Sequence, residues 1–415
     1  SDGCRSSCAA QRAVAPLNPP VAERSALSHL ECPRCRACAD ADIVQQLCAC
    51  GSPLLARYDL ERVRSTVSRD IVTARPDSLW RWCELLPVRD AAHRVTLGER
   101  ATPLVGLPST AAAAGIASLY VKDEGLLPTG SFKARGAAVG ISRALELGVR
   151  AFALPTNGNA GAAWSAYGRR AGMEAHFAMP KSAPAVHRFE CEAVGARVTL
   201  VDGLISDAGK LVAEWVRERG FFDASTLKEP YRIEGKKTLG FEIALQHGWS
   251  APDVILYPTG GGVGLIGIDK AFAELRALGW IDDRTPRMVA VQASGCAPIV
   301  RAWHAKERVS VLWEGAHTAA FGISVPKALG DFLVLEAIYG SDGCAAAVDD
   351  ATIVRARDAV ASADGVLLGL EGAATIAAAR ALRAQGWIRP GDRVLAINTG
   401  SAFKGLNPTP PSVSA

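Results

Sequence analysis

The sequence contains no apolar run that could cross a membrane and no block of charge of one sign. None of its apolar stretches approaches the roughly 20 residues that a membrane-spanning helix needs. Lys and Arg number 46 and Asp and Glu 42 among 415 residues, so the formal net charge is only +4. Because the two signs are mixed along the whole length, we expect neither a membrane nor a nucleic acid as partner.

Repeats of 20–50 residues, which would indicate a solenoid, are also missing. Residues 1–30 lack the apolar core of a secretion signal, and we expect them to form a disordered or loosely attached tail. Hydrophobic residues make up 49% of the chain and charged ones 21%, which is typical of a soluble globular protein. The odd total of eleven cysteines favours a reducing compartment, and we predict a cytoplasmic location.

The cysteines that are present are unevenly distributed. Seven fall in the first fifty residues, and the other four are expected to be buried thiols: Cys83, Cys191, Cys296 and Cys344. Residues 31–57 are predicted to form a small ribbon-like segment, because two close pairs of cysteines bracket it. Thiolates at such spacing can hold zinc in a tetrahedral site, and the candidate ligands are Cys32, Cys35, Cys48 and Cys50. A metal-free segment that packs on the main body is the alternative.

Short apolar runs alternate with amphipathic patterns from about residue 118 onward. Strands are predicted at SLYVKDE, AFALPT, EAHFAMP, ARVTLVDG, DVILYPTG, RMVAVQAS and RVLAINTG, and helices at 132–147, 160–171, 184–194, 204–219 and 262–277. Such alternation is typical of parallel sheets covered by helices on both faces. We therefore predict an α/β protein with two sheets and a cleft between two α/β units, one over 104–228 and one over 58–103 plus 229–406.

Three loops that follow predicted strands carry unusual chemistry. They read PTGSFK (128–133), PTNGNAG (155–161) and PTGGGVG (258–264). Ligands of open α/β sheets bind outside the carboxyl ends of the strands. These loops are therefore the expected binding region.

The third loop has the features of a phosphate cradle. Its glycines leave backbone N–H groups bare just before a predicted helix, whose dipole is positive at that end. Glycine-rich turns also serve tight packing alone, and the spacing matches neither the P-loop nor the dinucleotide fingerprint. In the second loop, Asn157, Gly158 and Asn159 open a helix, where they can hold a carboxylate or cap the helix.

Lys133 lies at a strand-to-helix turn beside Phe132. A partly desolvated lysine has a lowered pKa and becomes a usable amine nucleophile. An amine beside a phosphate cradle suits an aldehyde cofactor that carries a phosphate. The coincidence of three such loops is stronger evidence than any one of them.

Several blocks, in order, resemble one known family. They are VKDEGLLPTGSFKARG (121–136), EGKKTLGFEIALQ (234–246), PDVILYPTGGGVGLIG (252–267), GLEGAAT (369–375) and INTGSAFKGL (397–406). These resemble the fold-type II pyridoxal-phosphate enzymes of the tryptophan synthase β-like group, and within it the threonine synthase family. The cysteine-rich segment before them is similar to that family's N-terminal part. The resemblance covers roughly residues 30–406 and implies two open, twisted, mainly parallel sheets flanked by helices, with pyridoxal 5'-phosphate in the interdomain cleft.

The resemblance implies a role for each residue of the three loops. Lys133 would hold the cofactor as a Schiff base and shuttle protons. Phe132 would lie against the cofactor ring, Asn159 would bind its hydroxyl, and Thr399 would face its nitrogen. The phosphate would be held by the amides of Gly260, Gly261, Gly262, Val263 and Gly264. The substrate carboxylate would be held by Asn157, Gly158 and Ala160.

The implied activity is that of a carbon–oxygen lyase in amino-acid biosynthesis. It converts O-phospho-L-homoserine and water to L-threonine and phosphate by γ-elimination and β-addition. The resemblance also implies a small amino-acid substrate and a homodimer. Lys236, Lys237 and Arg135 are candidate cations for the substrate phosphate, with an ordinary surface charge as the alternative for each.

Two positions depart from the family pattern and leave alternatives open. Ala134 stands where the family usually has an acidic residue, and Leu127 stands where it usually has Asn. A serine/threonine ammonia-lyase or a β-replacement enzyme of the same fold is one alternative. A zinc-ribbon protein that binds a partner, or a catalytically dead amino-acid sensor, is another, although the retention of Lys133 and all three loops counts against the sensor.

Overall fold

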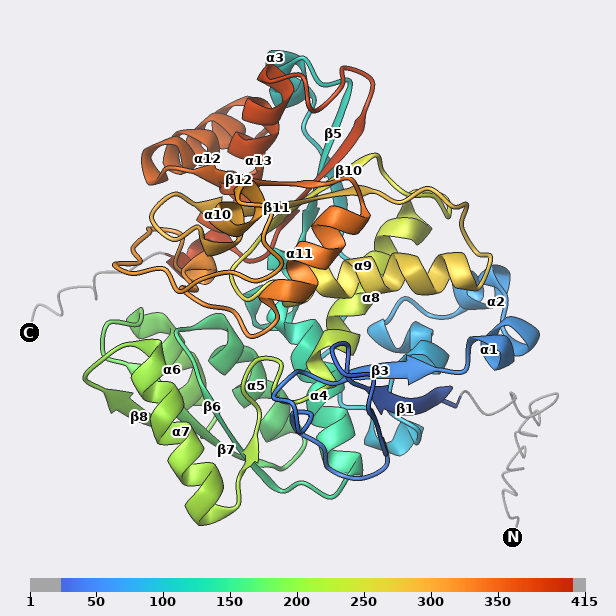
Figure 1. The fold of residues 1–415 in the computed structure, drawn as a ribbon, viewed down its shortest axis with the longest axis vertical. Helices are drawn as coiled ribbons and strands as arrows, with labels where there is room; N and C mark the ends of the chain where they lie inside the picture. The colour runs from blue at the N-terminus through green and yellow to red at the C-terminus, as the bar shows by residue number, and fades with distance from the viewer. Residues whose placement is uncertain (1–23, 406–415) are drawn as a thin grey trace, which may run out of the picture.

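The computed structural model describes residues 24–405, which contain three β-sheets (Figure 1). An antiparallel ribbon has the strand order β2-β1-β3, a six-stranded sheet has the order β12-β11-β10-β13-β5-β4, and a four-stranded sheet has the order β8-β7-β6-β9. The strands are β1 (Leu27–Glu31), β2 (Cys38–Ala39), β3 (Leu55–Tyr58), β4 (Leu104–Gly106), β5 (Ser118–Asp123), β6 (Ala151–Pro155), β7 (Glu174–Pro180), β8 (Arg197–Val201), β9 (Phe222–Asp223), β10 (Val254–Pro258), β11 (Arg287–Ala293), β12 (Cys344–Val348) and β13 (Arg393–Asn398).

Thirteen α-helices surround the sheets in this part of the chain. They are α1 (Leu60–Thr66), α2 (Arg69–Ala74), α3 (Pro108–Ala114), α4 (Lys133–Glu146), α5 (Asn159–Arg170), α6 (Ala185–Ala193), α7 (Ile205–Arg219), α8 (Arg232–Gln246), α9 (Val263–Ala277), α10 (Pro298–His304), α11 (Asp331–Gly340), α12 (Asp350–Asp364) and α13 (Leu370–Ala384). Among residues 24–405, no helix is both long and apolar enough to span a membrane.

The six-stranded sheet is parallel except for β4, which pairs with β5 in the antiparallel sense. Successive side chains of a strand point to opposite faces of the sheet. Because helices cover both faces of this sheet, its strands are apolar at most positions. On β10, Val254 and Leu256 join the hydrophobic cluster under α3, α12 and α13. Ile255 and Tyr257 join the larger cluster under α8, α9 and α11 on the other side. The sheet is thus buried on both faces.

The four-stranded sheet is fully parallel and lies in the lower part of Figure 1. Ala153 and Ala178 pack against Val212 and Trp215 of α7 on one face. Helix α5 contacts α6 and strand β7, and α6 contacts strand β8. Helices α4 and α8 pack together between the two sheets and so connect the two halves of the molecule.

Buried charges fix helix α4, which begins with Lys133. The guanidinium of Arg135 donates to Glu124 at 2.6 Å and to Glu242 of α8 at 2.7 Å. Lys122 of β5 also pairs with Glu242 at 2.8 Å. Burial raises the pKa of Glu242, but Arg135 and Lys122 outweigh it and lower that pKa to about 2. This network orients the start of α4 relative to β5 and α8.

The predicted α/β class with two mainly parallel sheets is confirmed. The five predicted helices are observed as α4, α5, α6, α7 and α9, each within one residue of its predicted ends, whereas the other eight helices of residues 24–405 were not predicted. The expected unit boundary at residue 104 is wrong with respect to the sheets, because β4 and β5 belong to the six-stranded sheet and the four-stranded sheet begins at Ala151. The expected tail over residues 1–30 is too long, because β1 already begins at Leu27. Its residues 1–23 lie outside the described part of the chain.

Candidate active site

A cavity of about 630 Å³ opens between the two α/β halves of the protein. Its wall comes from the loops after β6, β10 and β13, from the start of α4, and from residues 319–329. The carboxyl ends of parallel strands from both sheets therefore meet around one space, as expected for a ligand site in α/β proteins.

Lys133 lies in this wall at the first position of α4. The preceding turn is tied to the end of β13, because the N–H of Phe132 donates to the carbonyl of Thr399 at 3.0 Å. The amine of Lys133 lies 4.2 Å from the centre of the Phe132 ring. Burial, and then the charge of Arg232, lower the pKa of Lys133 to about 8, against an opposing effect of Glu371. About a tenth of this amine is therefore neutral at pH 7, far more than for a solvated lysine.

The glycine-rich loop joins β10 to α9 at the wall of the cavity. Gly260, Gly261, Gly262 and Val263 all line the cavity. Gly262 has φ +72°, and a Cβ there would lie 2.1 Å from Val334 Cγ2. Gly264 does not line the cavity: a Cβ at that position would meet the Tyr257 hydroxyl at 1.9 Å, so its role is to allow close packing.

The loop after β6 opens α5 at the opposite side of the cavity. Asn157, Gly158, Asn159 and Ala160 all line it. The hydroxyl of Thr156 accepts hydrogen bonds from the N–H groups of Gly158 at 3.0 Å and Gly161 at 2.9 Å, which holds the loop in a tight turn. The helix start therefore directs its positive end toward the cavity.

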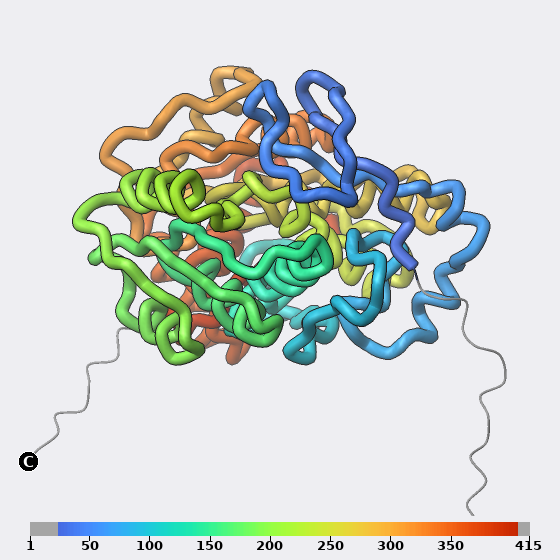
Figure 2. The backbone as a smooth tube through the Cα atoms, turned by 90° about the horizontal axis from the view of Figure 1, so that it is seen from below, coloured from blue at the N-terminus to red at the C-terminus, as the bar shows by residue number. Residues whose placement is uncertain are grey.

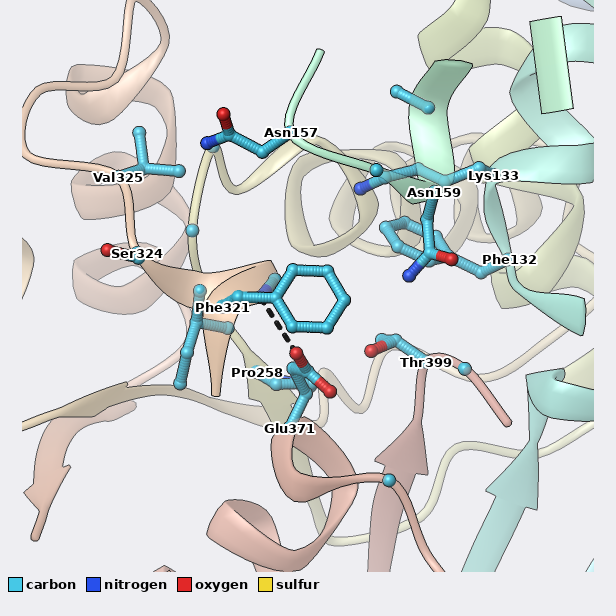
Figure 3. Close-up of a pocket in the computed structure, with 18 of the residues that line it drawn as sticks. Phe132, Lys133, Asn157, Asn159, Pro258, Phe321, Ser324, Val325, Glu371 and Thr399 are labelled. Atoms are coloured by element: carbon cyan, nitrogen blue, oxygen red, sulfur yellow. Dashed lines mark hydrogen bonds between the residues drawn. The ribbon is translucent and has the colours of Figure 1, made fainter. Parts of the chain in front are cut away.

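Three polar groups from three different elements point into the same space (Figure 3). They are the amine of Lys133, the amide of Asn159 and the hydroxyl of Thr399. The side-chain oxygen of Asn159 is buried and has no hydrogen-bond partner among residues 24–405. A buried polar atom without a partner is costly, and a ligand hydroxyl that reached this amide would remove that cost.

This arrangement fits pyridoxal phosphate. A partly neutral amine, an unsatisfied amide oxygen and a turn of bare amides at a helix start lie around one cavity. The amine can react with the aldehyde of the cofactor, and the turn at the helix start can bind its phosphate. Thr399 lies between Asn398 and Gly400, so the side chain that faces the cavity at the end of β13 carries a hydroxyl and not a carboxylate.

Among the cations expected for a substrate phosphate, only Lys236 lines the cavity. Arg135 is committed to Glu124 and Glu242, and Lys237 to Glu234 and Glu274, all in the interior. Neither Arg135 nor Lys237 is part of the cavity wall, and the expectation for these two residues is wrong.

Arg232, at the start of α8, lines the cavity and was missed by the sequence analysis. Its Nε donates to Glu229 at 2.8 Å and its Nη1 to Thr226 at 3.0 Å, so the guanidinium is held in place. The sequence gives no specific indication of Arg232, because a single arginine near the start of a helix has many ordinary roles and belongs to no motif here.

Glu371 and residues 319–329 were also missed. Glu371 accepts a hydrogen bond from the N–H of Gly322 at 2.8 Å. The dashed line in Figure 3 marks this bond, close to Phe321 in the cavity wall. Glu371 lies in the GLEGAAT block, which carried the resemblance without suggesting a role. Residues 319–329 form an irregular loop with no motif, and only the tertiary fold brings it to the site.

The four candidate zinc ligands lie together in the ribbon. The Sγ atoms of Cys32, Cys35, Cys48 and Cys50 are all within 4.8 Å of one another. None of the four lines the large cavity.

The chain is similar to known proteins along most of its length. Residues 95–400 match the family described as "Pyridoxal-phosphate dependent enzyme". The threonine synthase of Methanocaldococcus jannaschii is 34% identical over 90% of this chain and 92% of that protein, and the threonine synthase of Methanosarcina acetivorans is 35% identical over 91% and 92%. Among solved structures, maize serine racemase superposes with a TM-score of 0.63 over 72% of this chain and 88% of that one, at 23% identity, which is evidence for the fold alone.

Proposed function

The chain belongs to the pyridoxal-phosphate-dependent enzymes and, within them, to the threonine synthases, and we propose that it converts O-phospho-L-homoserine and water to L-threonine and phosphate. It is thus a lyase that acts on a carbon–oxygen bond. The observation that carries the proposal is the sequence identity to threonine synthases over about nine tenths of both chains, joined to a cavity that fits the cofactor.

Pyridoxal phosphate, when bound, supplies an electron sink for carbanion character at the substrate Cα. In our proposal, Lys133 would be its covalent attachment point, and Phe132 would lie against its ring. Asn159 would offer its amide to the ring hydroxyl, and Thr399 would offer a hydroxyl to the ring nitrogen. The amides of Gly260, Gly261, Gly262 and Val263 would hold the phosphate. A hydroxyl at the ring nitrogen does not keep that nitrogen protonated, which favours elimination and replacement over transamination.

The amine of Lys133 is the proposed general base and acid. Its lowered pKa allows it to accept the Cα proton near neutral pH, and the same amine can then move a proton at Cβ as phosphate leaves Cγ. Asn157, Gly158 and Ala160 are proposed to hold the substrate carboxylate at the start of α5, where the backbone amides and the helix dipole favour an anion.

Arg232 and Lys236 are the proposed cations for the substrate phosphate. The planar guanidinium of Arg232 can bind two phosphate oxygens. Burial and the nearby Lys133 lower the pKa of Lys236 well below its usual value. An arriving phosphate would favour protonation of that amine and so strengthen its own binding.

The test is a side-by-side assay of the purified holoenzyme with O-phospho-L-homoserine, L-serine and L-threonine. We expect threonine and phosphate in equal amounts from the first substrate and little turnover of the other two. Release of ammonia and a keto acid from serine or threonine would instead identify an ammonia-lyase, the alternative left open by Ala134 and Leu127. Lys133→Ala should abolish either activity.

We also propose a homodimer and a cytoplasmic location, on the family resemblance and the cysteine content respectively. Sedimentation equilibrium of the holoenzyme tests the first. A mass of one chain at assay concentrations would refute it.

A further inference from the structure

We propose that one zinc ion is bound by the thiolates of Cys32, Cys35, Cys48 and Cys50, and that it fixes the N-terminal ribbon against the active-site wall. This inference is independent of the proposed reaction. The ribbon comprises β1 and β3 with the two turns that carry the cysteines, over residues 27–58.

The distances between the sulfurs fit a tetrahedral site. Zinc binds thiolate sulfur at about 2.3 Å, so the sulfurs of a tetrahedral site are about 3.8 Å apart. Cys32 Sγ lies 3.5 Å from Cys50 Sγ, and Cys35 Sγ lies 3.5 Å from Cys48 Sγ. All four sulfurs lie within 4.8 Å of one another. A disulfide would need about 2.05 Å, so neither pair is bonded.

The backbone of both turns directs the thiolates inward. In the first turn the N–H of Cys35 donates to Cys32 Sγ at 3.4 Å, and the N–H of Arg36 donates to the carbonyl of Cys32 at 3.0 Å. In the second turn the N–H of Gly51 donates to the carbonyl of Cys48 at 2.8 Å. An N–H group that donates to sulfur stabilises a thiolate, which is the form that binds metal.

The ribbon needs such a crosslink because its own core is small. Residues 40–54 contain no helix or strand, and β2 has only two residues. The buried cluster that the ribbon forms is short: Leu27, Leu30, Cys32, Ala41, Leu54 and Ala56, with Tyr231 from the main body. Segments of this size usually depend on a metal or disulfides for their fold.

The metal site also adjoins the wall of the active-site cavity. The guanidinium carbon of Arg34, between two of the ligands, lies 4.2 Å from the centre of the Phe332 ring. Cys50 and Arg34 share a depression with Lys327 and Leu329, and these last two residues also line the large cavity. Figure 2 shows the ribbon, in blue, beside the orange segment that includes these residues. Zinc would therefore hold the ribbon where it supports residues 327–332.

Elemental analysis of the holoenzyme, purified with reductant and without chelator, is the first test. We expect about one zinc per chain in the wild type and in Cys38→Ser, because Cys38 lies in the same ribbon but outside the four-thiol group. Cys35→Ser should lose the zinc. Zinc-free wild type, iron in place of zinc, or full zinc in Cys35→Ser would overturn the proposal.

Cobalt exchange tests the geometry without a variant that might misfold. Wild-type protein whose zinc is replaced by Co²⁺ should show the thiolate charge-transfer and intense visible bands of a tetrahedral thiolate site. The weak bands of an octahedral ion would contradict it. Hydrogen exchange then tests whether the zinc-bound ribbon stabilises residues 327–332. Removal of zinc should speed amide exchange in these residues but not in α12. Equal exchange with and without zinc would refute this stabilisation.

Discussion

At the scale of single residues, the reactivity of the site depends on the charges around the amine of Lys133. Burial lowers the pKa of that amine most, Arg232 lowers it further, and Glu371 opposes both effects. The same arginine is the strongest candidate for binding the substrate phosphate. Both of its proposed effects can be measured separately.

The first prediction concerns the pH dependence of cofactor uptake. Only the neutral amine attacks an aldehyde, and the folded-state pKa of Lys133 is lowered to about 8. The rate at which apoprotein binds pyridoxal phosphate should therefore rise with pH, with its midpoint near pH 8 and a plateau about one pH unit higher. Stopped-flow absorbance measures this rate, and a midpoint near that of a solvated lysine would contradict the prediction.

The second prediction concerns Arg232→Met. Loss of its charge should move the midpoint of cofactor uptake to higher pH and raise KM for O-phospho-L-homoserine about 10- to 100-fold, as expected for a lost charge-assisted hydrogen bond. Arg188→Met, on an exposed part of α6, is the control and should change neither. Because Arg232 also pairs with Glu229, thermal unfolding is measured in parallel. An unchanged KM in a folded variant would remove Arg232 from the site.

At this scale the sequence revealed the residues that lie within motifs. Lys133, Asn159 and the glycines after β10 could be predicted because each belongs to a strand–loop–helix pattern with its own chemistry. The sequence could not predict that Arg232 lines the cavity, nor that Lys236 lines it and Lys237 does not. Adjacent residues on one helix point in different directions, and only the packing of α8 decides which one meets the cavity.

At the scale of elements, the position of Lys133 depends on how α4 packs on α8 and β5. The ion pairs of Arg135 with Glu124 and Glu242 lie in the interior, where neither partner is exposed. Sequence could not reveal them, because the partners lie 11 and 107 residues away along the chain. Because Arg135 forms these ion pairs, it stabilises the position of α4 and does not contact the cavity.

The third prediction is that Glu242→Ala destabilises the protein by about 3–5 kcal/mol, because it leaves Arg135 and Lys122 with an uncompensated buried charge. Asp202→Ala breaks the exposed pair with Lys181 and should cost less than about 1 kcal/mol. Chemical denaturation of both variants measures the difference. Equal losses would show that the buried network does not stabilise α4.

The fourth prediction concerns the loop between β10 and α9. Gly262→Ala introduces a Cβ at positive φ and against Val334, so the loop must move. Affinity for pyridoxal phosphate should fall, whereas affinity for pyridoxal, which lacks the phosphate, should change little.

Gly209→Ala is the matched control for that variant. Gly209 lies within α7, and a Cβ there meets no atom within 4 Å. It should leave cofactor affinity unchanged and stabilise the helix by about 0.5–1 kcal/mol. If Gly262→Ala weakens both ligands equally, the loop does not act as a phosphate cradle.

At the scale of the whole molecule, the class of fold could be predicted from the sequence, but the assignment of chain segments to the two sheets could not. Local periodicity identifies β5 as a strand but does not show its partner. Its pairing with β13, at Ser118 and Arg393, joins segments 275 residues apart, so β5 lies in the same sheet as the C-terminal strands. Lys133 consequently stands at the junction of the two halves, and the cavity forms only when both are in place.

The most direct measurement is to locate the covalently held cofactor. The holoenzyme is reduced with borohydride, digested, and its peptides are sequenced by mass spectrometry. We predict that the peptide containing Lys133 alone carries the mass of a reduced phosphopyridoxyl group, with loss of the visible absorbance of the cofactor. Attachment at Lys236 or any other lysine, or no attachment at all, would contradict the account.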